Sequence, residues 1–295
     1  MGGRLERTKN IRALPSVEIM NANPGKPIPF ALIIPCHNFV AGLPETLRRL
    51  AAWMPNTPSG TQVYFVDDGS TDATAKLLAD FVSHQPSGYT LLKHKNNRGK
   101  GAALLTGLQA CQDHFEAVVF TDCDLHYGLT VILDRILPAL QNYDVVLLDR
   151  SWVRKHHWMS PWRRLSSSVF NRLVSILTGV NYRDTQAGLK GFRTTPLKHL
   201  WPLLRLQGFA FDIELLSLAC FYRLPILQIP IAFDLAYQAP THSTIHRFLS
   251  PITMVRDLFR INWYWKRGYY YSAPLVARID ATVYSVHVAD EKENV

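Results

Sequence analysis

Short apolar runs that alternate with helix-like segments constrain this chain more than any other feature. They are rich in β-branched residues, and they lie at 30–35, 62–66, 89–92, 117–121, 144–148 and 226–233. Strands of this kind are buried on both faces, and parallel strands need crossover connections that are usually helical. The pattern therefore predicts an α/β fold, with a mostly parallel sheet covered by helices on both faces.

Helical signals lie between and after these runs. Apolar spacing predicts helices over 43–53 and near 129–140, and Ser70 or Thr71 is expected to cap the helix after the second strand. Longer apolar stripes at helical spacing follow over 165–177 and 245–259. The second stripe is compatible with a core-packing helix or with an amphipathic helix at a membrane interface.

Composition and charge narrow the possible partners. The chain has 295 residues, of which 47% are hydrophobic and 19% charged, and its formal net charge is +9. A positive net charge favours binding to anionic partners such as phosphorylated ligands, anionic lipid or nucleic acid. Because no nucleic-acid-binding motif accompanies the charge, we expect no nucleic-acid partner.

The chain divides into three predicted parts. Residues 1–29 are basic and aperiodic and are expected to form a flexible arm, 30–235 to form the α/β domain, and 236–295 to form an amphipathic, aromatic segment at a membrane interface.

No window is long and apolar enough for a transmembrane helix, and the N-terminus lacks the apolar core of a signal peptide. The four scattered cysteines are typical of reduced thiols. We expect a peripheral protein on the cytoplasmic face of a membrane.

Two carboxylates separated by one residue follow the apolar run at 117–121. In an extended backbone the side chains of Asp122 and Asp124 point the same way, beyond the carboxyl end of the strand, where open α/β sheets bind ligands. Such oxygen ligands suit Mg²⁺ or Mn²⁺, together with the phosphates of a substrate. His126 could add a nitrogen ligand that favours Mn²⁺, or it could be an ordinary loop histidine.

Further polar motifs fall at strand ends and helix starts. They are Asp67-Asp68, Gly99-Lys100-Gly101 and Asp212-x-Glu214. The alternative interpretations are a turn with a helix cap, an ordinary helix start, and acidic residues favoured by a helix dipole. A basic, Trp-containing run over 150–172 could hold a phosphate through bidentate arginines or could be a solvated face.

These motifs, in this order, resemble the family 2 glycosyltransferases of the GT-A fold over about residues 30–235. More narrowly, they resemble the polyprenyl-phosphate sugar synthases, and the pattern over 184–190 looks more like the glucosyl branch than the mannosyl branch. The resemblance implies an inverting transfer of a hexose from UDP-glucose or GDP-mannose to a polyprenyl or dolichyl phosphate, with Mg²⁺ or Mn²⁺ as cofactor. Phe39 and the segment 237–244 depart from the family pattern.

The resemblance also implies roles for individual residues. Nucleotide-sugar contacts are expected at Pro35, Asn38, Asp67, Asp68, Lys100, Gly101, Arg150 and Gln186. The expected catalytic carboxylates are Asp122, Asp124, Asp212 and Glu214, and the expected metal ligands are Asp122, Asp124 and His126. The acceptor phosphate is expected at Arg163, Arg164 and Ser243.

Two other functions remain open at this stage. An acceptor hydroxyl on a glycolipid or polysaccharide would need a carboxylate base, which Asp212 or Glu214 would have to supply. A catalytically silent, membrane-associated binding protein could keep the fold without turnover. In each case the chain is expected at a membrane surface, where a separate anchoring subunit could hold it.

Overall fold

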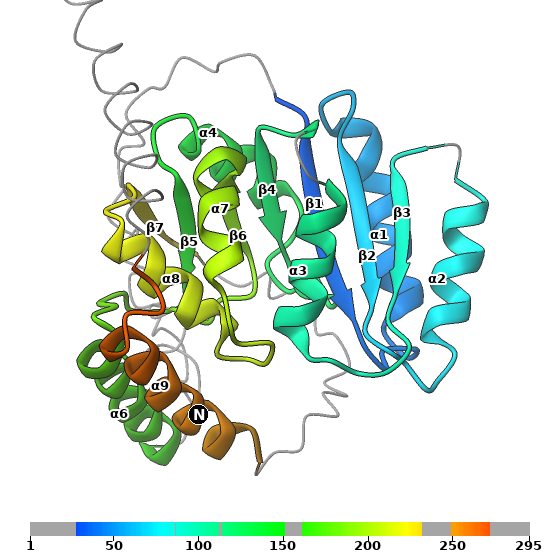
Figure 1. The fold of residues 1–295 in the computed structure, drawn as a ribbon. Coiled ribbons are helices and arrows are strands. Elements are labelled where there is room, and N and C mark those ends of the chain that lie inside the picture. Colours follow the sequence, from blue (N-terminus) through cyan, green and yellow to red (C-terminus); the bar gives the residue numbers. More distant parts are fainter. Residues whose placement is uncertain (1–27, 86, 112–113, 151–160, 232–248, 272–295) are drawn as a thin grey trace, which may run out of the picture.

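The computed structural model describes residues 28–85, 87–111, 114–150, 161–231 and 249–271, with the backbone alone at 161–168 and 249–252. A seven-stranded sheet with the order β3-β2-β1-β4-β6-β5-β7 forms its centre (Figure 1). The strands are β1 (Phe30–Cys36), β2 (Gln62–Asp67), β3 (Tyr89–Lys93), β4 (Ala117–Phe120), β5 (Val145–Asp149), β6 (Lys190–Arg193) and β7 (Ile226–Pro230). The predicted mostly parallel sheet is confirmed, since only the two pairings of β6 are antiparallel.

Strand β6 is not predicted from the sequence, because it lies in a polar, glycine-containing motif rather than in an apolar run. It is inserted between β4 and β5, with Lys190 opposite both Phe120 and Leu147. Since β6 runs against its neighbours, its first residue lies near their carboxyl ends. The preceding segment 184–189 is therefore brought to the edge of the sheet where ligands are expected.

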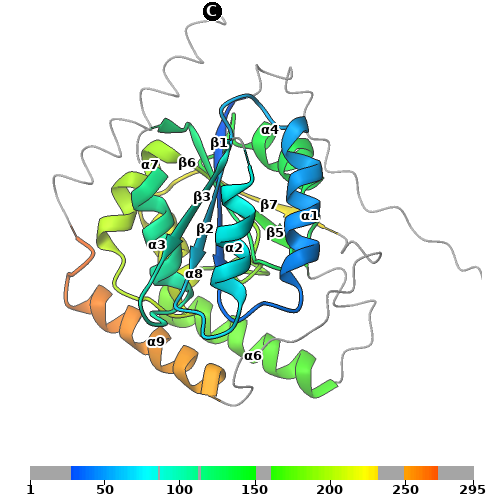
Figure 2. The ribbon, with the colours of Figure 1, turned by 90° about the vertical axis from the view of Figure 1, so that its right-hand side faces the viewer.

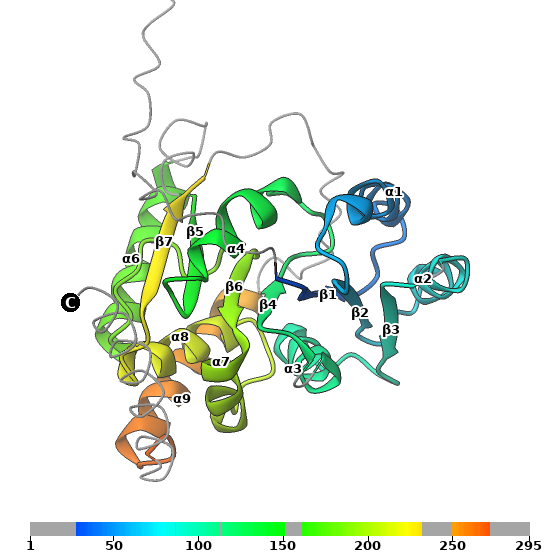
Figure 3. The ribbon, with the colours of Figure 1, turned by 90° about the horizontal axis from the view of Figure 1, so that it is seen from above.

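Helices cover both faces of the sheet (Figure 3). They are α1 (Leu43–Trp53), α2 (Thr74–Ser83), α3 (Lys100–Cys111), α4 (Leu137–Ala139), α6 (Pro161–Thr178), α7 (Thr194–Leu200), α8 (Phe211–Phe221) and α9 (Leu249–Lys266). Short turns of 3-10 helix lie at Met54–Asn56 and Trp201–Leu203, and a π-helical turn at Ile132–Ile136 precedes α4. The expected helix near 129–140 is thus broken into short pieces.

The side chains of β1 show how the core is divided. Leu32 and Ile34 pack into the cluster that contains Leu50 of α1, whereas Ile33 packs into the cluster that contains Leu108 of α3. All are fully buried. Because successive side chains of a strand point to opposite faces, one apolar run supplies both layers of the core.

The predicted cap of α2 is wrong. The helix begins at Thr74, whose N–H donates to Oδ1 of Asp72 at 2.9 Å, and neither Ser70 nor Thr71 caps it. The N–H groups of Thr71 and Asp72 instead donate to Oδ1 of Asn38, at 2.8 and 3.4 Å. Because Asn38 holds this turn against the end of β1, the helix starts beyond it.

Helices α6 and α9 pack side by side beyond the carboxyl edge of the sheet (Figures 1 and 2). Leu258 and Ile261 of α9 are fully buried in the core cluster that also contains residues of α8, whereas Phe259 and Trp263 are about half exposed. The predicted apolar stripe at 245–259 therefore contributes side chains both to the core and to the surface. Its first residues, 245–248, lie outside the described part of the chain. Among the described helices, none combines the length and the apolar character needed to span a membrane.

Candidate functional site

The carboxyl ends of β1 and β4 form the centre of the candidate site. β1 pairs with β2 on one side and with β4 on the other, so the strand order reverses at this point. Open α/β sheets bind ligands in the crevice outside such a reversal. Asp122 and Asp124 follow β4 directly, as the sequence predicts, and Lys100 begins the neighbouring helix α3.

Two lysines and two carboxylates form an alternating charge cluster at this edge of the sheet. Nζ of Lys100 lies 2.6 Å from Oδ1 of Asp122, and Nζ of Lys190 lies 3.1 Å from Oδ1 of Asp212. Burial alone would raise the pKa of Asp122, but the charge of Lys100 outweighs it and holds that pKa below its ordinary value. Burial lowers the pKa of Lys190 against the opposing charge of Asp212.

Asp124 has different electrostatic surroundings. Burial and the negative charge of Asp122 raise the pKa of Asp124, and its Oδ2 lies 3.4 Å from Nε2 of His126. Within the described ranges, no three His, Cys, Asp or Glu side chains are grouped so as to hold a metal ion by themselves. The residues nevertheless fit Mg²⁺ or Mn²⁺, because a divalent cation relieves the repulsion of two carboxylates and completes its shell with phosphates and water.

Gly188 leaves the space in which the Asp122 carboxylate lies. A Cβ added to Gly188 would be 1.7 Å from Oδ2 of Asp122, a distance that no real side chain can adopt. The N–H of Gly188 donates to the hydroxyl of Tyr127 at 3.2 Å, and Tyr127 is buried. The absence of a side chain at Gly188 therefore determines where Asp122 can point.

A buried ion pair fixes Arg150 at the end of β5. Nε and Nη2 of Arg150 donate to the two carboxylate oxygens of Asp184 at 2.5 and 2.9 Å, and the backbone N–H of Arg150 donates to the same carboxylate. Burial would lower the pKa of Arg150, but Asp184 raises it, so the guanidinium stays charged. Gln186, on the same loop, donates from Nε2 to Sδ of Met254 in α9 at 3.7 Å.

Asp68 holds the loop that leads to Lys100. Its carboxylate accepts the N–H groups of Arg98 and Gly99 at 2.9 and 2.8 Å and contacts Nδ1 of His94 at 2.7 Å. Asp68 is 3% exposed, so these partners replace the water it has lost. The structure thus places Asp68 under the loop, where it orients the start of α3.

The other residues for which we expect nucleotide contacts lie at the ends of β1 and β2. Asn38 has a positive φ of 47° and uses its side-chain oxygen on the 71–72 turn. Asp67 is buried, and its Oδ1 accepts the N–H of Ser70 at 3.4 Å. Pro35 lies opposite Val66 in the sheet. These residues share the edge that carries Asp122, but they lie at the ends of β1 and β2 rather than at the end of β4.

Asp212 and Glu214, although only two residues apart on α8, face different surroundings. Asp212 joins the charge cluster, whereas Glu214 is fully buried and accepts the N–H groups of Arg205 and Leu206 at 3.0 and 2.8 Å. It also accepts the hydroxyl of Tyr270, and burial raises its pKa. Residues at i and i+2 do not share a helix face, so Glu214 does not join the charge cluster.

The expected acceptor residues lie at the limits of the described chain. Arg163 and Arg164 belong to α6 at positions where only the backbone is described, and Ser243 lies outside the described residues.

Three residues that make contacts in or beside the site were not predicted from the sequence: His94, Tyr127 and Tyr270. Each joins residues that are far apart in the chain, and no local pattern marks them. Lys190 belongs to the 184–190 motif, so that motif does signal it.

We expect Glu214→Ala to destabilise the fold by about 3 kcal/mol, because it leaves buried donors on Arg205, Leu206 and Tyr270 without an acceptor. This corresponds to a fall in melting temperature of roughly 8 °C in a thermal scan. Tyr270→Phe removes one of the three partners and should cost about 1 kcal/mol. Equal melting temperatures for Glu214→Ala and the unmodified protein would contradict the anchoring role.

Comparisons of the sequence with known proteins match this chain to a family of glycosyltransferases. A family model described as Glycosyl transferase family 2 matches residues 31–201. Dolichyl-phosphate beta-glucosyltransferase from Dictyostelium discoideum is 27% identical over 85% of this chain and 79% of that protein. Undecaprenyl-phosphate 4-deoxy-4-formamido-L-arabinose transferase from Pseudomonas savastanoi pv. phaseolicola is 32% identical over 57% of this chain, which matches 49% of that protein's length.

Solved structures show the same fold. Glucosyl-3-phosphoglycerate synthase from Mycobacterium tuberculosis, in complex with UDP, superposes with a TM-score of 0.56 at 18% identity, over 82% of this chain and 80% of that one. Its complex with Mn²⁺, UDP-glucose and phosphoglyceric acid gives the same TM-score at 19% identity and the same coverage. The predicted GT-A fold is confirmed. Because the family model covers more than half of the chain, from β1 through the Asp122–Asp124 pair and β6, this protein belongs to glycosyl transferase family 2.

Proposed function

We propose that this chain transfers a hexose from a nucleotide sugar to a polyprenyl or dolichyl phosphate, with inversion at the anomeric carbon. The observation that carries the proposal is its similarity to dolichyl-phosphate beta-glucosyltransferases, which extends over 85% of this chain and 79% of one relative. A second relative of that name, from Drosophila melanogaster, is 28% identical over 78% of this chain. These names favour UDP-glucose over GDP-mannose as the donor.

In the proposed reaction the residues of the charge cluster and their neighbours would bind the nucleotide sugar and its metal ion. Asp122 and Asp124, with His126 beside them, would hold Mg²⁺ or Mn²⁺, and the bound ion would neutralise charge on the departing diphosphate. Solved neighbours that contain Mn²⁺ or Mg²⁺ support this use of the pair. Lys100 and Arg150 add fixed positive charge near the same phosphates. Asn38 and Asp67 would line the nucleotide pocket, whereas Asp68 orients Lys100 through the loop it binds.

Both carboxylates on α8, Asp212 and Glu214, already have ion-pair or hydrogen-bond partners, which favours a phosphate acceptor over a hydroxyl acceptor. A hydroxyl nucleophile needs a base to remove its proton, whereas a lipid phosphate is already anionic near neutral pH. Asp212 is ion-paired with Lys190, and Glu214 is buried against backbone donors. With both carboxylates engaged, transfer to a phosphate oxygen needs only positioning and charge neutralisation.

The surface of α6 and α9 supports peripheral membrane association. Exposed apolar side chains lie on both helices and on the turn that follows α9: Val169, Ile176, Phe259, Trp263, Tyr269 and Tyr271. Arg267 stacks over Trp263 at 5.6 Å. Exposed aromatic and aliphatic side chains bordered by arginine are typical of a helix that lies in a membrane interface. We place this face on the cytoplasmic surface of a membrane, alone or with an anchoring subunit.

The proposed reaction is tested by incubating the protein with Mn²⁺, a short polyprenyl phosphate and either UDP-glucose or GDP-mannose. We expect lipid-linked hexose from UDP-glucose, measured by mass spectrometry, and a loss of roughly 10³-fold in rate for Asp124→Ala or on chelation of the metal. Full activity of Asp124→Ala would exclude its metal role. Nucleotide release without glycolipid would indicate a hydroxyl acceptor, and nucleotide binding without turnover would indicate a silent binding protein.

We expect Gly188→Ala to lower kcat by at least about 10²-fold, because the new methyl group would displace the Asp122 carboxylate from the position in which it would hold the metal ion. The matched control is Gly179→Ala. Unlike Gly188, Gly179 has a positive φ, which strains alanine by about 1 kcal/mol, but a Cβ there meets nothing within 4 Å. The control should therefore lose stability and keep its kcat. Similar kcat values for the two variants would contradict the role of Gly188.

A further inference from the structure

His94 joins two elements of the fold through its side chain, and the proposed reaction does not yet use it. It follows β3 directly. Its Nδ1 lies 2.7 Å from Oδ1 of Asp68, just after β2, and its Nε2 lies 2.8 Å from Oγ1 of Thr106 in α3. The side chains of His94 and Asp68 are 5% and 4% exposed. The imidazole is therefore a buried bridge between the end of β2 and α3.

The two partners determine the role of each ring nitrogen of His94. A carboxylate oxygen only accepts hydrogen bonds, so the proton between the ring and Asp68 must be carried by Nδ1. A threonine hydroxyl both donates and accepts, so Thr106 satisfies Nε2 whether or not that nitrogen is protonated. Nδ1 is consequently a fixed donor to Asp68, while Nε2 anchors the ring to α3.

Nδ1 of His94 helps to determine which way the Asp68 carboxylate points. Oδ1 of Asp68 accepts this donor and the N–H of Arg98, the latter at 2.9 Å, while Oδ2 accepts the N–H of Gly99 at 2.8 Å. Rotation of the carboxylate would disturb all three bonds in a place that water does not reach. The next residue, Lys100, belongs to the charge cluster. His94 is thus connected to Lys100 through one carboxylate and two backbone N–H groups.

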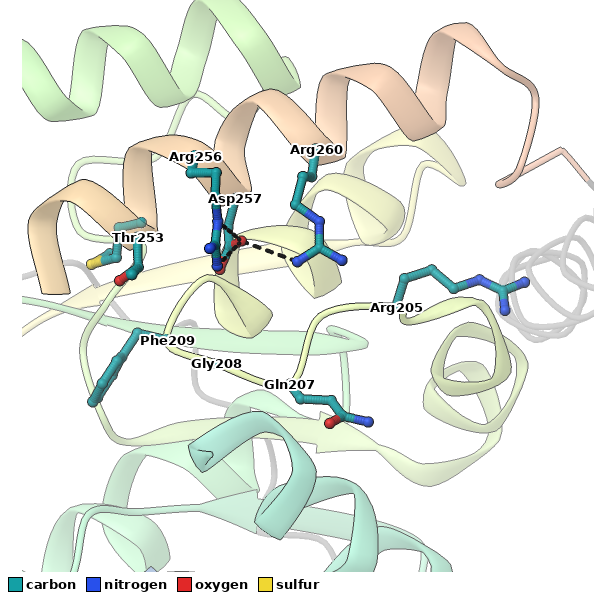
Figure 4. A pocket seen from close by; sticks show the side chains of 9 residues that line it. Arg205, Gln207, Gly208, Phe209, Thr253, Arg256, Asp257 and Arg260 are labelled. Atoms are coloured by element: carbon teal, nitrogen blue, oxygen red, sulfur yellow. Dashed lines mark hydrogen bonds and ion pairs between the residues drawn. The ribbon is translucent and has the colours of Figure 1, made fainter. Parts of the chain in front are cut away.

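The backbone around Lys100 is also supported from the side of α8. The carbonyl of Gln207 accepts the N–H of Ala102 at 3.1 Å, and a Cβ added to Gly99 would lie 2.6 Å from the same oxygen. Gln207 lies on the loop 205–209, which forms one wall of a cavity of about 450 Å³ beside α9 (Figure 4). This support comes from backbone atoms. A substitution of His94 therefore removes the support on one side of Lys100 and leaves the other in place.

We propose that His94 is a positioning residue for nucleotide-sugar binding, because its Nδ1–H fixes Asp68 and Asp68 in turn fixes Lys100 for the diphosphate of the donor. The inference rests on the proposed function, which it deepens. A lysine that is already held in place binds a phosphate without the cost of ordering its loop. Loss of the bridge should therefore weaken donor binding more than it affects the acceptor.

Binding of UDP in the presence of Mn²⁺ tests the inference without turnover. UDP is titrated by calorimetry into the full-length protein, His94→Leu and His94→Asn. Leucine removes both contacts, whereas the asparagine amide keeps a donor near the position of Nδ1 and is too short for Thr106. We expect UDP binding to be at least roughly 10-fold weaker for His94→Leu and to stay within about 3-fold for His94→Asn. Unchanged affinity in His94→Leu, equal losses in the two variants, or no UDP binding by the unmodified protein would overturn the proposal.

Two further variants separate positioning from stability. The hydroxyl of Tyr89, which begins β3 at the end opposite His94, donates to the carbonyl of Leu50 at 3.2 Å. Tyr89→Phe removes this buried hydrogen bond, so it should lower the melting temperature and leave the affinity for UDP unchanged. A loss of UDP affinity equal to that of His94→Leu would overturn the proposal. If leucine prevents folding, His94→Gln replaces it: its longer amide faces Thr106 rather than Asp68, and it should show the same loss.

A double-mutant cycle tests whether His94 acts through Lys100. Lys100→Gln alone should weaken UDP binding, because it removes the positive charge beside the diphosphate. Adding His94→Leu to Lys100→Gln should weaken binding by less than about 3-fold more, since residues that act through one another are not additive. Losses that multiply in the double variant would show that His94 acts independently and would overturn the proposal.

Kinetics distinguish failure of this inference from failure of the proposed reaction. In the transfer assay, His94→Leu should raise the KM for UDP-glucose roughly 10-fold while the KM for polyprenyl phosphate stays unchanged. Normal UDP-glucose kinetics of this variant in an active enzyme would refute the role of His94 and leave the reaction standing. Conversely, UDP binding that is weakened by leucine and restored by asparagine, with no transfer by the unmodified protein, would support the role of His94 and refute the reaction.

Discussion

The burial of opposite charges at the carboxyl edge of the sheet is the constraint on which the rest of the structure depends. Lys190 is 1% exposed, and a lysine so far from water needs an anionic partner to remain charged. Asp212 supplies that charge, while Lys100 pairs with Asp122. Their chain positions require β4, β6 and the starts of α3 and α8 to meet at one point. The reversed strand β6 makes this possible, because it carries Lys190 to the ends of its neighbours.

A second group of polar residues holds the loops around this cluster. Asp68 binds the backbone before Lys100, Asp184 clamps Arg150, and Glu214 ties the 205–206 backbone to Tyr270. Each of these carboxylates is buried and accepts several donors, which makes it costly to move. The loops around the charge cluster are therefore preorganised, as a site that works by positioning and electrostatics requires.

Helix α9 links the site to the surface. Its inner face, with Leu258 and Ile261, belongs to the core, while Arg256 and Arg260 face the cavity and Phe259 and Trp263 face outward. One helix thus contacts the protein interior, a polar cavity and the apolar surface together. This arrangement suits a reaction that would join a water-soluble donor to an acceptor with a long hydrocarbon chain.

The sequence by itself determined the class of fold, the positions of six of the seven strands in the described part of the chain, and the placement of Asp122 and Asp124 after a strand, because apolar periodicity and strand ends are local properties of the chain. The sequence did not reveal β6, because this strand is held by pairing with its neighbours and has no apolar pattern of its own. It also did not reveal where α2 begins, because Asn38, from another loop, binds the turn that precedes the helix. Nor could it separate Asp212 from Glu214, which look alike in the sequence. Only the tertiary structure decided that Asp212 faces Lys190 in the charge cluster and that Glu214 faces backbone N–H groups in the core. The physical reason is that the role of a buried carboxylate is set by its hydrogen-bond and ion-pair partners, and here those partners come from distant parts of the chain.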